Sequence, residues 1–238
     1  MIRPQPINSG ADMPQAATRT ENLAELLKRL GGIDPRRIRT WPPLGTATEK
    51  DVLHVLDHED SICELVDGVL VEKIMGALES ALAFELGRFL GNFLQDHDLG
   101  FLLGADSTLR LMPKLVRIPD ITFISWAQMP SREYPTEPIP KLHPDLAVEV
   151  LSEGNTPGEM RRKLREYFGS GARLVWLVDP ADRTVQFFTA PDQMKSLTET
   201  DTLDGGRVLP GFRLSLKRLF ARVPKSRSRK NGKPRRKS

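Results

Sequence analysis

The segment from His143 to Leu151 restricts the fold of this chain more than any other part of the sequence. It has the length and composition of a β-strand. Apolar residues occupy both of its faces: Leu146, Val148 and Val150 on one, and Ala147 and Leu151, which flank Glu149, on the other. We therefore expect a strand inside a sheet, with other elements packed against each face.

The neighbouring segments supply these elements. Apolar residues at helical spacing predict helices over 77–95 and 159–168. Short strands are predicted at 100–103, 107–111, 115–124, 173–178 and 184–189, with a meander over 196–214 and a hairpin around Asp67-Gly68. This order of helix, several strands, helix and two strands predicts a mixed sheet with a helix on each face, in the α/β to α+β range.

The 238 residues suit one main domain. Residues 1–45 are expected to form an N-terminal arm with a short helix, which Thr20 caps and which Gly31-Gly32 ends. Residues 46–221 form the predicted domain, which opens with a helix capped by Thr46 or Thr48. Residues 222–238 form a tail.

The positive charge of the chain is concentrated in this tail. The formal net charge is +4, but the last 17 residues hold nine Lys and Arg and no acid, whereas the rest holds 26 basic and 31 acidic residues. Such a tail is expected to be disordered and attracted to polyanions such as nucleic acid. The alternative is a tail that serves only solubility.

Several classes of protein are excluded. No run approaches the roughly 18 apolar residues of a membrane span, and the N-terminus lacks the apolar stretch of a signal peptide. The single cysteine, Cys63, excludes an internal disulfide framework and a Cys-rich zinc site. We therefore expect a cytoplasmic protein without membrane contact.

Two acids stand inside apolar segments: Asp120 within 115–124 and Glu149 within 146–151. A buried carboxylate without a partner costs several kcal/mol, so each must be paired, hydrogen-bonded or bound to a metal. Two carboxylates on strands of one sheet can converge on Mg²⁺, which prefers oxygen ligands. The alternative is that each acid ends a strand or pairs with an arginine.

Lys163 is the third candidate. It lies three residues after Met160 and four before Tyr167, so it borders the apolar stripe of the predicted helix. From that border an ammonium can reach back over the sheet, where it could stabilise phosphate charge or orient a water. The alternative is a lysine whose stem lies on the apolar surface and whose charge is solvated.

The ordered set of these segments resembles a known family. Residues 64–73, 116–121, 148–152, 163–168 and 174–180 are similar to the Uma2 family of restriction endonucleases, which belongs to the PD-(D/E)XK nuclease superfamily. The likeness covers about 46–220. It implies a restriction-endonuclease-like core, in which a mixed central sheet is flanked by helices.

The resemblance also implies roles for individual residues. Asp120 matches the aspartate of the "PD" element and Glu149 the acid of the "(D/E)XK" element, both ligands of Mg²⁺ or Mn²⁺. The backbone carbonyl of Val150 would be a further ligand. A helical glutamate often completes such sites; Glu79 matches it best, and Glu64 is a rival.

One position departs from the superfamily pattern. Leu151 stands where the pattern places a lysine, and an alkyl group cannot donate to a phosphate. Related families take this lysine from the following helix, where Lys163 lies. The resemblance thus implies a metal-dependent endonuclease that hydrolyses DNA, with a homodimer left open. The alternatives are RNA as substrate, or a catalytically inactive nuclease-fold module that binds nucleic acid or protein.

The tail yields a first prediction. Deletion of residues 222–238 removes nine positive charges and should weaken DNA binding, with a smaller dependence of affinity on salt. Metal binding should persist. Titration of labelled duplex DNA at two salt concentrations measures this, and equal affinities of the full and shortened chains at low salt would contradict a role in DNA binding.

Overall fold

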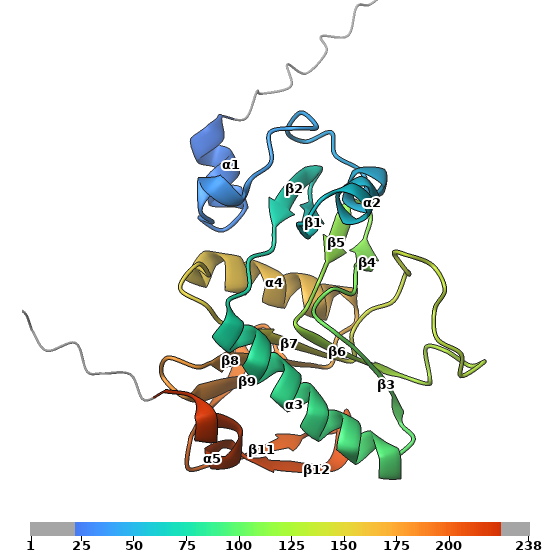
Figure 1. Cartoon of the computed structure of the whole chain (residues 1–238), viewed down its shortest axis with the longest axis vertical. Helices are drawn as coiled ribbons and strands as arrows, with labels where there is room; N and C mark the ends of the chain where they lie inside the picture. The colour runs from blue at the N-terminus through green and yellow to red at the C-terminus, as the bar shows by residue number, and fades with distance from the viewer. Residues whose placement is uncertain (1–21, 225–238) are drawn as a thin grey trace, which may run out of the picture.

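The computed structural model of the chain describes residues 22–224. Its centre is a six-stranded sheet (Figure 1). The strand order is β10 (Gln193–Thr198), β9 (Thr184–Ala190), β8 (Leu174–Asp179), β7 (Leu146–Val150), β6 (Ile121–Ser125) and β3 (Gly100–Leu103). Only β7 and β8 pair in parallel. The predicted mixed sheet is confirmed.

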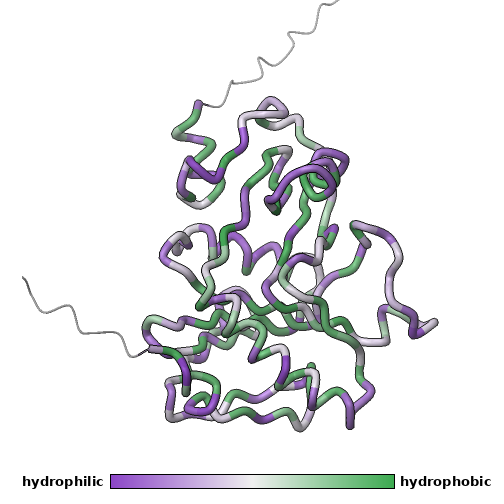
Figure 2. The backbone as a smooth tube through the Cα atoms, viewed as in Figure 1, coloured by the Kyte–Doolittle hydropathy of each residue, from purple (hydrophilic) through white to green (hydrophobic). Residues whose placement is uncertain are grey.

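Helices cover both faces of this sheet, as the pattern of β7 predicts. Leu146, Val148 and Val150 pack in one apolar cluster with α3 (Ala77–Asp96), whereas Ala147 packs in another cluster with α4 (Pro157–Ser170). The first cluster is closed by β11 (Thr202–Gly205), β12 (Leu209–Ser215), α5 (Leu216–Leu219) and η2 (Phe220–Arg222). Figure 2 shows apolar residues running along the central strands.

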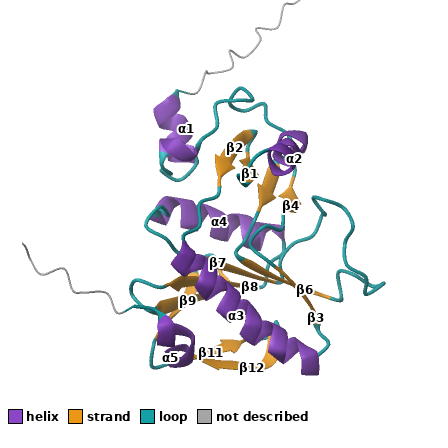
Figure 3. Ribbon diagram, viewed as in Figure 1, coloured by secondary structure: helices purple, strands orange, loops and turns teal. Residues whose placement is uncertain are grey.

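A second sheet lies on the far side of α4, so this helix is held between two sheets (Figures 1 and 3). Its order is β2 (Val69–Glu72), β1 (Cys63–Val66), β5 (Leu115–Arg117) and β4 (Leu109–Met112). Asp67 and Gly68 form the β1–β2 turn with φ of 52° and 77°, as the hairpin signal predicts.

The prediction of one strand over 115–124 is wrong. The segment forms β5 in the second sheet and β6 in the central sheet. The chain changes sheets at Ile118–Asp120, because Pro119 has no N–H to donate to a ladder and interrupts strand pairing. This change of sheet places Asp120 immediately before β6.

Details of the helices also differ from expectation. Thr20 lies outside the described residues, and Asn22 caps α1 (Leu23–Arg29) in a capping box with Glu25. Thr48 caps α2 (Glu49–His58), as predicted. Leu78 belongs to the apolar pattern that predicts a helix over 77–95, but it lies in the first turn of α3 and is 39% exposed. No helix within residues 22–224 is long and apolar enough to cross a bilayer.

The N-terminal segment packs tightly on α4. The Gly31 carbonyl accepts from the Thr156 hydroxyl at 2.7 Å. Arg37 forms two hydrogen bonds to Glu159, 2.8 and 3.0 Å long, and both side chains are buried. A bidentate pair of this kind fixes the relative orientation of the two side chains as well as balancing their charges. The start of α4 is therefore fastened to the segment that follows α1.

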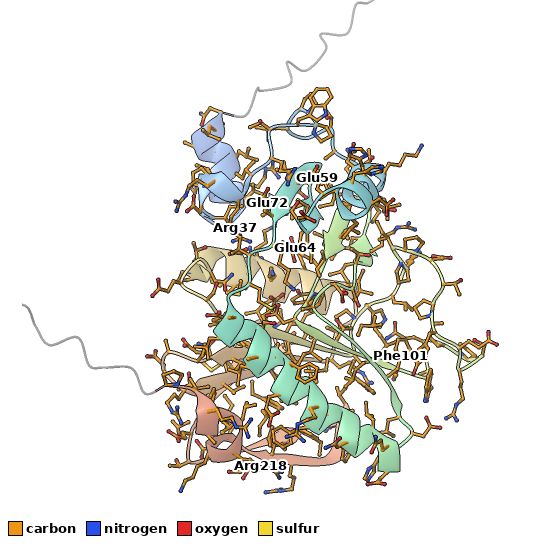
Figure 4. The ribbon with its side chains drawn as sticks, in the orientation of Figure 1. Arg37, Glu59, Glu64, Glu72, Phe101 and Arg218 are labelled. Atoms are coloured by element: carbon orange, nitrogen blue, oxygen red, sulfur yellow. The ribbon has the colours of Figure 1, made fainter. Side chains whose placement is uncertain are left out.

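Buried charges join the second sheet to α4 as well. Arg117 on β5 contacts Glu64 on β1 at 2.6 Å and Glu166 on α4 at 2.5 Å. Figure 4 shows Glu64 between this sheet and α4. Burial by itself would raise the pKa of Glu64, but the positive charges of Lys163 and Arg117 lower it to about 2. Glu64 is therefore ionised at neutral pH.

The close approach at Gly31 predicts a difference between two adjacent glycines. Both have positive φ, so an alanine at either costs about 1 kcal/mol. A Cβ at Gly31 would lie 2.4 Å from the Glu159 nitrogen, whereas a Cβ at Gly32 meets nothing within 4 Å. Gly31→Ala should cost about 1–3 kcal/mol more than Gly32→Ala. Urea unfolding of both variants measures this, and equal losses would contradict the close packing.

The low pKa of Glu64 predicts a dependence of stability on acid. Its contribution is fully present above its ordinary pKa of 4.5 and is lost as the pH falls toward about 2. Glu64→Gln should lower the free energy of unfolding at pH 7 by about 3 kcal/mol, and the difference from wild type should shrink below pH 4.5. Urea unfolding between pH 7 and pH 3 tests this, with exposed Glu133→Gln as the control. A difference that is independent of pH would contradict it.

Candidate active site

Asp120 and Glu149 approach each other at the end of β7. The Asp120 N–H donates to the Val148 carbonyl at 2.9 Å, and the Val150 N–H donates to Asp120 Oδ2 at 2.6 Å. The Asp120 carboxylate is thus held beside the residue that follows Glu149. The change of sheet at Pro119 brings about this contact, because it lets β6 start opposite β7.

Both carboxylates line one small cavity of about 20 Å³. The five site residues that the sequence predicts, Glu79, Asp120, Glu149, Val150 and Lys163, all line it. The full lining consists of Arg37, Lys73, Ile74, Met75, Glu79, Asp120, Glu149, Val150, Ser152, Asn155 and Lys163. This volume suffices for one water or a small ion. Two larger pockets share residues with it: one of about 570 Å³ includes Glu79 and Ser152, and one of about 430 Å³ includes Asp120.

Lys163 points to the sheet and not to solvent. Its Nζ lies 3.0 Å from Glu149 Oε1 and 3.3 Å from Glu64 Oε1, and the residue is 3% exposed. Burial by itself would lower the pKa of Lys163, but Glu149 and Glu64 raise it above its ordinary value. The alternative of a solvated lysine is excluded, and the ammonium stays protonated at neutral pH.

Tyr167 also belongs to this group, although the sequence placed it in the apolar stripe. Its hydroxyl donates to Glu149 Oε1. Burial and the charges of Glu149 and Glu64 raise the pKa of Tyr167 well above its ordinary value, so it remains a donor. Its spacing of four residues from Lys163 is a usable signal, because such residues share a helix face and a buried tyrosine hydroxyl needs a partner.

Glu149 keeps one oxygen unengaged. Oε1 receives both Lys163 and Tyr167, whereas Oε2 accepts no hydrogen bond from residues 22–224. Burial and the nearby charge of Asp120 raise the pKa of Glu149, against the opposing effect of Lys163. A further positive charge would therefore be favourable at this carboxylate.

Lys73 also lies at this site, although no pattern in the sequence predicted a role for it. Its Nζ lies 2.8 Å from Asp120 Oδ1. Each acid is thus paired with a lysine, Asp120 with Lys73 and Glu149 with Lys163, and not with the arginine that the alternative interpretation expected. Lys73 follows a predicted strand, and no spacing in the sequence relates it to Asp120.

The two candidate glutamates lie in different places. Glu79, in the first turn of α3, lines the cavity and is half-buried. Glu64 is fully buried and does not line it; it contacts Lys163 and Arg117 instead. Within residues 22–224, no three His, Cys, Asp or Glu side chains are grouped to hold a metal ion, so Glu79 does not form such a cluster with Asp120 and Glu149.

The donors at the cavity nevertheless fit a hard cation. Two carboxylates and the main chain of Val150 offer oxygen atoms, and Glu149 Oε2 is unengaged. Mg²⁺ takes one or two carboxylates from a protein and keeps several waters, so a third acidic ligand is not required.

Comparisons with known proteins agree with this architecture. No curated protein matches the chain. A crystal structure of a putative nuclease belonging to DUF820 from Anabaena variabilis ATCC 29413 matches with a TM-score of 0.60 and 20% identity, over 67% of this chain and 90% of that one. At this identity the match shows a shared fold, which confirms the predicted fold class.

A family model matches residues 50–217, which is more than half of the chain. Its description is Uma2, putative restriction endonuclease, and it agrees with the resemblance seen in the sequence. The family and the fold together support a nuclease function in general terms, with nucleic acid as the substrate. The chain belongs to the Uma2 family.

Proposed function

We propose that this chain is a metal-dependent endonuclease that hydrolyses phosphodiester bonds of DNA. Asp120, Glu149 and the Val150 carbonyl would hold Mg²⁺ or Mn²⁺. One observation carries the proposal: the carboxylates of Asp120, just before β6, and of Glu149, on the neighbouring β7, line one small cavity beside a buried ammonium from the next helix. The larger pockets that share Glu79 and Asp120 with this cavity give a nucleic acid room to approach.

A bound ion would polarise a phosphoryl oxygen and lower the pKa of the attacking water. The residues of the chain provide the arrangement in which this occurs. Tyr167 and Lys163 hold Glu149 through Oε1, which leaves Oε2 without a donor from the described residues. The Val150 N–H fixes Asp120. Groups held in this way need no rearrangement when the substrate arrives.

Lys163 supplies positive charge and not a base. Because Glu149 and Glu64 raise its pKa, it cannot take a proton from water at neutral pH. In a cavity with little water its charge would stabilise the negative charge that develops on the phosphate. Lys163 would thus replace the lysine that is missing at Leu151, and Glu79, at the same cavity, would orient a water.

One observation favours a second candidate, a catalytically inactive module that binds nucleic acid or protein. The charges of Asp120 and Glu149 are already balanced by Lys73 and Lys163 within the described residues. A site balanced in this way could persist as a purely structural ion network.

Plasmid nicking with Mn²⁺ distinguishes the two candidates. Wild type should nick supercoiled DNA, and Asp120→Ala, Glu149→Ala and Lys163→Ala should each slow nicking by at least about a hundredfold. Glu133→Ala, which removes an exposed acid, should nick like wild type.

The other outcomes are equally informative. Nicking that survives all three substitutions would exclude this site. No nicking by wild type together with retained DNA binding would favour the inactive module. Faster cleavage of a matched RNA than of DNA would assign RNA as the substrate.

A further inference from the structure

Lys73 is a second buried ammonium at the site, and the proposed reaction does not use it. It follows β2 directly, and its side chain is 9% exposed. Its Nζ donates to the Ile118 carbonyl at 2.6 Å and the Ala105 carbonyl at 3.1 Å, and contacts Asp120 Oδ1 at 2.8 Å. Two of its three hydrogens are thus used by backbone carbonyls, and its charge is paired with that of Asp120.

Lys73 forms an ion pair with Asp120, the same carboxylate that would bind the cation in the proposed function. Asp120 Oδ2 accepts a hydrogen bond from the Val150 N–H, and Oδ1 forms an ion pair with Lys73. A divalent cation bound to Asp120 would therefore lie close to an existing positive charge. Screening is weak in a cavity of about 20 Å³, so the two cations compete.

We propose that Lys73 is a positioning residue that serves as the counter-ion of Asp120 until a divalent cation replaces it. This inference rests on the proposed function. The Ile118 and Ala105 carbonyls belong to the backbone, so they keep the ammonium at the site after its contact with Asp120 is lost. Lys73 thereby keeps the Asp120 carboxylate in place, and it lowers the affinity of the site for metal.

Substitution of Lys73 tests the competition through metal affinity. Lys73→Gln retains a donor for the two carbonyls but removes the charge, and Lys73→Met removes both. Each should bind Mn²⁺ about tenfold or more tightly than wild type in calorimetric titrations. Lys73→Arg should stay near wild type. Lys50→Gln, which removes an exposed charge from α2, serves as the control and should not change the affinity.

A merely structural role of Lys73 would have the opposite signature. Loss of packing would weaken Mn²⁺ binding, whereas loss of a competing charge strengthens it. Unchanged or weaker binding by folded Lys73→Gln and Lys73→Met overturns the inference. For the unaltered protein, the ¹⁵N resonance of the Lys73 ammonium should shift when Mg²⁺ saturates the site; a resonance that does not move also overturns it.

The same titrations separate this inference from the proposed function. Asp120→Asn should abolish Mn²⁺ binding. If it binds like wild type, or if no variant binds, the metal site and the role of Lys73 both fail. If Asp120→Asn loses binding while Lys73→Gln binds like wild type, only the role of Lys73 fails.

Discussion

The structure depends on the compensation of buried charge around α4. Glu64 on β1, Glu149 on β7 and Glu166 on α4 itself are all buried. Isolated carboxylates in such a place would cost more free energy than a domain can supply. Lys163 and Arg117 offset them through ion pairs at 2.5–3.3 Å. The helix can therefore lie between two sheets and still carry charged groups inward.

This compensation also shapes the candidate active site. Two of the charged groups that stabilise the fold, Glu149 and Lys163, line the cavity. Each of these two groups has a further partner: the Tyr167 hydroxyl on α4 donates to Glu149, and Glu64 on β1 forms an ion pair with Lys163. Stability and chemistry therefore draw on the same contacts. In the part of the chain that the structure describes, this sharing leaves Glu149 Oε2 without a hydrogen-bond donor.

Much of the architecture was predictable because its signals are local. The alternation in 146–151 determines which face of β7 each side chain occupies, and Asp67-Gly68 specifies a turn with positive φ. The apolar stripe of the helix over 159–168, which Lys163 borders, predicts this residue at the edge of the core. The division of 115–124 into two strands was missed, because apolar residues continue across Pro119 and the pattern does not reveal which sheet each half joins.

The sequence by itself determined β7, the helix that follows it and the three candidate groups Asp120, Glu149 and Lys163, because periodicity and an acid in an apolar run are properties of short segments. Only the tertiary structure decided their partners. Lys73 reaches Asp120 across 47 positions, and Arg117 reaches Glu64 across 53. Ion pairs of this kind depend on how sheets and helices stack. Their charged groups are far apart in the sequence, and only the assembled fold brings them within a few ångströms of each other.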